Sequence, residues 1–109
     1  MEELEMVSFK VISSSGAAKS LFMEAMQYAR KREFEEAERC IKEGEENRQK
    51  GHEAHFELIQ KEASGDPVSI NLLLMHAEDQ LMATETIKIM AEEIIESYKA
   101  ISYLESKIK

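Results

Sequence analysis

Ser64-Gly65-Asp66-Pro67 is the stretch that decides the fold, because it is the sharpest break in a chain otherwise rich in helix formers. Glycine favours the residue just after a helix, aspartate caps the start of the next helix, and proline fits its first turn. The stretch therefore predicts a turn between two antiparallel helices. A charged seam at residues 30–33 separates two earlier segments with helical apolar periodicity. The two breaks predict three helices, at about 3–30, 33–63 and 67–107.

Composition narrows the class of protein further. The 109 residues include only 4 Gly and 1 Pro, and 14 Lys+Arg stand against 22 Asp+Glu, a net charge of −8. Few turn residues disfavour an all-β fold, and the length fits one domain, spanning 1–109. The acidic balance argues against nucleic-acid binding. No apolar run approaches the ~20 residues that cross a bilayer, and the acidic start is unlike a secretory signal.

The single cysteine, Cys40, excludes a disulfide within the chain and fits a reducing compartment. Cysteine is also among the most commonly buried residue types, so we expect Cys40 in the core rather than at a reactive site. We therefore expect a cytoplasmic, all-α, three-helix antiparallel bundle. The small residues Ser13-Ser14-Ser15-Gly16 interrupt the first helical pattern. They predict a close approach of another helix, and a break in the helix is the alternative.

The third helical segment is apolar on more than one face. Its predicted core stripe runs through Leu73, His76, Gln80, Ala83, Ile87, Met90, Ile94 and Ile101. Further apolar side chains point elsewhere, at Leu72, Leu74, Met75, Leu81, Met82, Ile89 and Ile95. Two neighbouring helices cover only part of such a surface. The pattern therefore predicts self-association through the third helix by a coiled-coil-like seam.

A polar group lies in this apolar segment. On a helix, His76, Asp79 and Gln80 fall within about 100° of one another, and Glu78 points away from them. A buried carboxylate needs a proton, a cation or several donors. Around a symmetry axis Asp79 would meet its own copies, so we expect a shared cation there. Oxygen ligands favour Mg²⁺ or Ca²⁺ over Cu⁺.

The two remaining histidines, His52 and His55, leave two interpretations open. Counted from the turn, His55 and His76 lie at the same level of the helical hairpin. One interpretation is a transition-metal site within one subunit, built from these histidines and Asp79. The other makes His52 a solvated surface residue and His55 a hydrogen-bonded interface residue.

Several stretches of the sequence resemble one protein family, and the similarity extends over nearly the whole chain. They are Leu72-Leu73-Leu74-Met75-His76-Ala77-Glu78-Asp79-Gln80-Leu81-Met82, Gly16-Ala17-Ala18-Lys19-Ser20, Arg32-Glu33-Phe34-Glu35-Glu36-Ala37 and Leu58-Ile59-Gln60-Lys61-Glu62-Ala63-Ser64-Gly65. The family is the lactose/cellobiose-type enzyme IIA of the bacterial phosphoenolpyruvate-dependent sugar phosphotransferase system. The first of these stretches resembles its active-site helix.

The resemblance implies a homotrimeric nine-helix bundle of three-helix subunits. It implies that His76 accepts a phosphoryl group from the phosphocarrier HPr and passes it to a cysteine of the IIB component. The membrane IIC component, not this chain, would bind the sugar. It also implies that Asp79 lies at the trimer axis and shares a divalent cation, for which Mg²⁺ is favoured. The expected role is a phosphoryl carrier in uptake of a β-glucoside-type disaccharide such as cellobiose or lactose.

The sequence departs from the family pattern around the histidine. Glu78 and His55 stand where the family commonly has Gln, Gln80 stands where it has His, and Ala83 stands where it has Thr. Gln80 and His55 are the expected donors to the phosphoryl group. A carboxylate at Glu78 would repel that group unless it faces a cation or solvent. The alternatives are a metal-binding helical bundle and a scaffold bundle, both without phosphoryl transfer.

Overall fold

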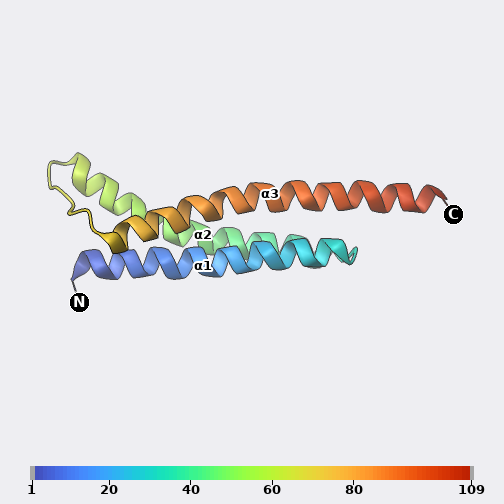
Figure 1. Cartoon of the computed structure of the whole chain (residues 1–109), viewed down its shortest axis with the longest axis horizontal. Coiled ribbons are helices and arrows are strands. Elements are labelled where there is room, and N and C mark those ends of the chain that lie inside the picture. The colour runs from blue at the N-terminus through green and yellow to red at the C-terminus, as the bar shows by residue number, and fades with distance from the viewer. Residues whose placement is uncertain (1, 109) are drawn as a thin grey trace.

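Three helices follow one another along the chain: α1 (Glu3–Arg30), α2 (Phe34–Ala63) and α3 (Leu72–Ile108). The computed structural model describes residues 2–108, and no strand occurs within that range. α1 and α2 form an antiparallel hairpin, and α3 runs back along both (Figure 1). The molecule measures 64 × 23 × 20 Å. The expected all-α, three-helix antiparallel fold is confirmed.

The first turn is tight because one residue takes the left-handed conformation. Arg32 has φ of 67°, and the backbone amides of residues 31–33 donate to carbonyls of Tyr28 and Ala29. The guanidinium of Arg32 also lies 5.2 Å from the centre of the Tyr98 ring and 3.0 Å from Glu105 Oε1. The charged seam at residues 30–33 thus closes the hairpin and attaches it to α3.

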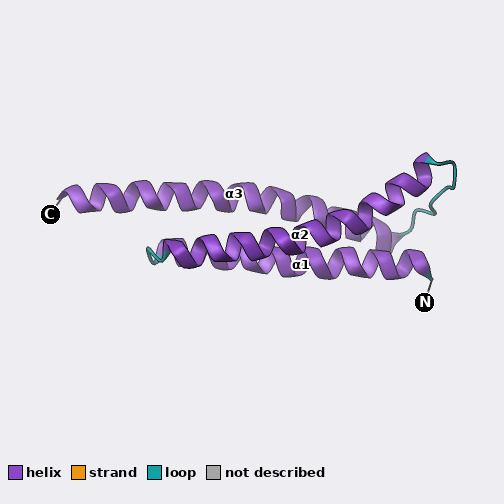
Figure 2. Ribbon diagram, turned by 180° about the vertical axis from the view of Figure 1, so that it is seen from behind, coloured by secondary structure: helices purple, strands orange, loops and turns teal. Residues whose placement is uncertain are grey.

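The third helix begins later than the sequence predicts, at Leu72 rather than about residue 67. Gly65, with φ of 95°, ends the second helical segment as expected. Asp66, however, does not cap a helix. Asn71 does, because its Oδ1 accepts a hydrogen bond of 2.8 Å from the backbone N–H of Leu74. Residues 66–71 therefore form an irregular connection between α2 and α3 (Figure 2).

Small residues let α1 and α2 approach closely. α1 is continuous through residues 13–16, and Ser15 is fully buried there. A methyl group at Gly51 would lie 3.5 Å from both Ser14 Cβ and Ser15 Oγ. The predicted close approach at this patch is confirmed. Cys40 is fully buried, as expected, and burial raises the pKa of its thiol.

The predicted core stripe of the third helix is wrong. The buried residues are Leu74, Ala77, Leu81, Thr84, Ala91 and Ile95. His76, Ala83, Met90 and Ile101 of the predicted stripe are exposed. Because α3 is apolar on several faces, periodicity alone does not choose among them. The chain buries the face on which alanine and threonine alternate with larger residues, which lets α3 lie close against the hairpin.

The opposite face of α3 stays uncovered by its own chain. The exposed large apolar residues of α3 are Leu72, Met75, Met82, Ile89, Met90, Ile101, Tyr103, Leu104 and Ile108, and most of them point away from the hairpin. The C-terminal end of α3 also extends past the α1–α2 turn (Figure 1). Within residues 2–108, no helix is both long and apolar enough to cross a membrane.

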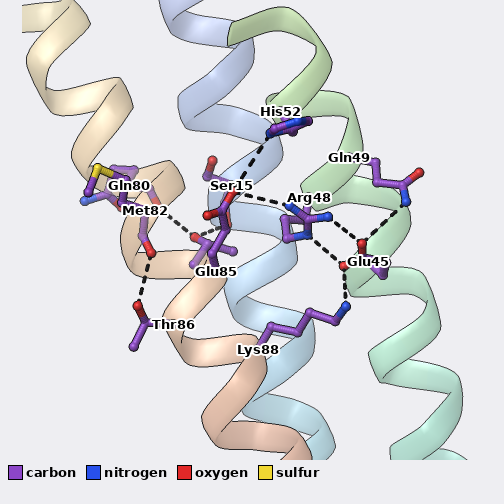
Figure 3. Close-up of polar contacts among 11 residues, drawn as sticks. Ser15, Glu45, Arg48, Gln49, His52, Gln80, Met82, Glu85, Thr86 and Lys88 are labelled. Atoms are coloured by element: carbon purple, nitrogen blue, oxygen red, sulfur yellow. Dashed lines mark hydrogen bonds and ion pairs between the residues drawn. The ribbon is translucent and has the colours of Figure 1, made fainter. Parts of the chain in front are cut away.

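Ion pairs connect α2 to α3 along the middle of the bundle (Figure 3). Arg48 Nη2 lies 2.6 Å from Glu45 Oε1, and Arg48 Nη1 lies 3.3 Å from Glu85 on α3. Lys88 of α3 lies 2.9 Å from the other oxygen of Glu45. The hydrogen bond from Arg48 lowers the pKa of Glu45 from 4.5 to about 2. The carboxylate of Glu45 is therefore held ionised between two cations.

Replacing Glu45 by glutamine should lower the free energy of unfolding by about 1–2 kcal/mol at pH 7. The folded-state pKa of Glu45 lies below the unfolded one. Its stabilisation is therefore complete above about pH 4.5 and declines as the pH falls towards 2. In urea unfolding at fixed protein concentration, the difference in the free energy of unfolding between wild type and Glu45→Gln should become smaller from pH 5 to pH 2.5. The matched control is Glu46→Gln, at an exposed position on the same helix, which should leave stability nearly unchanged.

Candidate functional site

His76 lies near the start of α3, just after the Asn71 cap, and its side chain is exposed. The buried residues Leu74 and Ala77 attach this part of α3 to the core. The exposed side chains Leu72, Met75 and Met82, with exposed fractions of 82%, 56% and 67%, share the outer side of the helix with it. An imidazole at an exposed apolar rim is open to another molecule rather than engaged in the bundle.

Asp79 points directly away from the core of its own chain. At about 100° per residue, it lies about 160° from both Ala77 and Leu81, which are buried. Its side chain is exposed, and no ion pair to it forms within residues 2–108. Gln80 is half-buried beside His76, and its backbone carbonyl accepts a 2.7 Å hydrogen bond from Thr84 Oγ1. The structure thus places His76 and Asp79 on the uncovered side of α3, with Gln80 at its edge.

His55 is held by Glu78, on a different flank of α3 from His76. Nε2 of His55 lies 2.8 Å from Oε1 of Glu78. The exposed fractions of the two side chains are 18% and 47%. Glu78 and His76 point about 160° apart around the helix, with buried Ala77 between them in the sequence. The structure therefore places His55 at the α2–α3 interface, and this contact is to Glu78 rather than to His76.

The transition-metal site within one subunit is contradicted. Across residues 2–108, no group of three or more histidine, cysteine, aspartate or glutamate side chains is arranged to hold a metal. The histidines separate because each faces its own neighbour. His52 stacks on Phe56 at 6.4 Å between ring centres, and its Nδ1 lies 4.0 Å from Glu85.

The interpretation of His55 as a hydrogen-bonded interface residue is confirmed, and its partner, Glu78, is the feature that sequence reasoning missed. The sequence indicated that a Glu78 carboxylate would repel the phosphoryl group unless it faced a cation or solvent, and the structure places an imidazole from α2 beside it. The signal was present in the distances from the turn. His55 lies ten residues before Gly65, and Glu78 lies at a similar distance after Asp66, so antiparallel helices bring them to one level.

A three-helix bundle with an exposed histidine on the outer apolar side of its longest helix matches one class of proteins, the IIA components of the phosphotransferase system. The family described as “PTS system, Lactose/Cellobiose specific IIA subunit” matches residues 6–99. The chain belongs to this lactose/cellobiose family.

Relatives and solved structures agree with the family. The lichenan-specific phosphotransferase enzyme IIA component of Bacillus subtilis is 41% identical, over 93% of this chain and 92% of its own. The lactose-specific EIIA component of Staphylococcus aureus is 34% identical, over 90% and 95%. The cellobiose-specific enzyme IIA of Bacillus anthracis superposes with a TM-score of 0.92 at 38% identity, covering 94% of each chain.

A structure of the Escherichia coli IIA(Chitobiose)–HPr complex is also similar. It has a TM-score of 0.81 and 27% identity, and the match covers 94% of this chain and 99% of that one.

Proposed function

We propose that this chain is a phosphoryl carrier that accepts a phosphoryl group from phospho-HPr on His76 and passes it to a IIB component. The exposed imidazole on an apolar rim of α3 is the observation that supports this role. The carrier would act in the cytoplasm during uptake of a β-linked disaccharide, such as cellobiose or lactose. The relatives named for lichenan, lactose and cellobiose support a substrate of this kind.

The proposed chemistry is two successive transfers. A neutral ring nitrogen of His76 attacks the phosphorus atom of phospho-HPr with its lone pair, and the bond from phosphorus to HPr breaks. A cysteine thiolate of IIB then attacks the same phosphorus atom, and the phosphorus–nitrogen bond to His76 breaks. Leu72, Met75 and Met82 would exclude water while a partner is docked. The amide of Gln80 is the nearest donor in sequence for the phosphoryl oxygens.

A homotrimeric nine-helix bundle would cover the outer face of α3. Along that face, Leu72, Met75, Asp79, Met82 and Thr86 recur at steps of three and four residues. Such a spacing is typical of a coiled-coil seam. Asp79, directly opposite the core, would then lie nearest the symmetry axis.

Three copies of Asp79 at the axis suit a divalent cation. One chain supplies a single exposed carboxylate here, too few ligands alone, whereas three chains supply several oxygens of the kind that Mg²⁺ accepts. The cation would neutralise three like charges brought together by assembly. Asp79 from each subunit would hold it.

Replacing Asp79 by asparagine should remove this cation while leaving the fold intact. We expect the purified wild-type oligomer to retain about one divalent ion per three chains, and the variant to retain none. Elemental analysis, together with the oligomer mass from light scattering, measures both quantities. Unchanged metal content in Asp79→Asn would refute the axial site.

The labelling experiment tests the carrier role directly. Purified protein is incubated with enzyme I, HPr and ³²P-labelled phosphoenolpyruvate, and IIB is then added. We expect an acid-labile label on this chain that moves to IIB. Failure of the wild-type chain to take up label, with HPr itself labelled, would favour the metal-binding or scaffold alternative.

A further inference from the structure

His55 of α2 and Glu78 of α3 form a hydrogen-bonded pair that has no part in the proposed carrier role. Its atoms are 2.8 Å apart, and the imidazole of His55 is mostly buried. Glu78 is a carboxylate two residues from the proposed phosphoryl acceptor. A free carboxylate near an incoming phosphoryl group repels it, because both carry negative charge.

The positions of His76 and Glu78 around α3 indicate whether the pair would lie near His76 of its own chain or of a neighbouring subunit. His76 and Glu78 lie on opposite flanks of the outer face that is centred on Asp79. When copies of α3 pack around a threefold axis through that face, the His76 flank of one chain meets the Glu78 flank of the next. The charge of Glu78 therefore acts most strongly on the neighbouring subunit's reaction centre.

We propose that His55 is a positioning residue, which holds the Glu78 carboxylate against α2 and so keeps it away from the phosphoryl group on His76 of the neighbouring subunit. This inference rests on the proposed carrier role and on the trimer. His55 acts through Glu78 and has no direct part in the transfer. Its hydrogen bond holds the Glu78 carboxylate in place, and the negative charge of that carboxylate would otherwise oppose phosphoryl transfer to His76.

Three variants distinguish positioning from packing. His55→Leu removes the donor but keeps an apolar side chain, and should slow phosphoryl transfer from phospho-HPr about fivefold. His55→Gln keeps a donor and should retain the wild-type rate. The double variant His55→Leu/Glu78→Gln removes the repelling charge and should recover most of the rate. If the double variant stays as slow as His55→Leu, the positioning role is refuted.

The matched control is His52→Leu, one turn earlier on α2, which should transfer at the wild-type rate. Circular dichroism and oligomer mass should be equal for all variants. Failure of the carrier role and failure of the positioning role give different results. A wild-type chain that takes up no label refutes the carrier role. A labelled wild type with an unaffected His55→Leu variant refutes this inference alone.

Mixed trimers test the action between subunits. Chains of His55→Leu, which retain His76, are refolded with an excess of His76→Ala chains, which retain the His55–Glu78 pair. Most remaining histidines then face an intact pair on the neighbour, and the transfer rate per histidine should rise towards wild type. A rate that stays at the His55→Leu value would contradict action between subunits.

Discussion

The variant His76→Ala should take up at least about 1000-fold less phosphoryl group from phospho-HPr than the wild-type chain. Alanine has no lone pair for phosphorus, and residues 2–108 place no second histidine at the same position. Of its three histidines, His55 is engaged with Glu78, and His52 stacks on Phe56. His76 is exposed, so its loss should leave the fold and the oligomer mass unchanged.

His52→Leu and His55→Leu are the controls for this prediction. Both should still form the acid-labile phosphoryl adduct, the second one about fivefold more slowly. Acid-labile label that persists on His76→Ala would assign the acceptor to another residue. Peptide mapping of the labelled wild type under alkaline conditions, where phosphohistidine survives, should place the adduct in the peptide that contains residues 72–82.

Gly44→Ala should lower the free energy of unfolding by about 2–3 kcal/mol, against the usual preference for alanine in helices. The new methyl group would lie 2.5 Å from Cε1 and 2.8 Å from Cδ1 of Phe22. Phe22 is fully buried in α1, so its ring can withdraw only into other packed side chains. The ring or the two helices must therefore shift, and the loss of packing outweighs the gain in helix propensity of about 1 kcal/mol.

Gly16→Ala is the matched control, since it lies in the interior of α1 and nothing is within 4 Å of an added methyl group. It should raise stability by about 0.5–1 kcal/mol. Phe22→Leu introduced into Gly44→Ala should give a double variant that loses less than the sum of the two single losses. Urea unfolding at equal protein concentration measures the wild type, the three single variants and the double variant. Equal stability of Gly44→Ala and Gly16→Ala would contradict the close approach.

The number of helices and the first turn could be predicted from the sequence because they depend on local signals. Gly65 ends α2, and the seam at 30–33 forms the other turn. The start of α3 was misplaced because Asp66 and Pro67 are a plausible start, whereas Asn71 caps the helix. Two competing caps a few residues apart differ by about 1 kcal/mol at most.

The candidate site could be predicted only in part, for a reason of symmetry. His76, Asp79 and Gln80 share one side of α3, as their spacing indicated. His76 and Gln80 were expected in the core stripe, yet the subunit buries the stripe through Leu74 and Leu81. A helix that contacts its own chain on one face and, in the proposed trimer, its copies on another carries two apolar stripes. Both stripes have helical spacing, so periodicity alone does not predict which one faces the core of the subunit.

The overhanging C-terminal end of α3 lies far along the helix from His76 (Figure 1). Ser106 lies about 45 Å from His76 at 1.5 Å per residue. A fluorophore on a cysteine introduced there would sit on an exposed position, and the native Cys40 is fully buried and shielded from the labelling reagent. In a parallel trimer three such fluorophores converge. Their self-quenching would therefore report subunit exchange in real time while the reacting end of the molecule remains undisturbed.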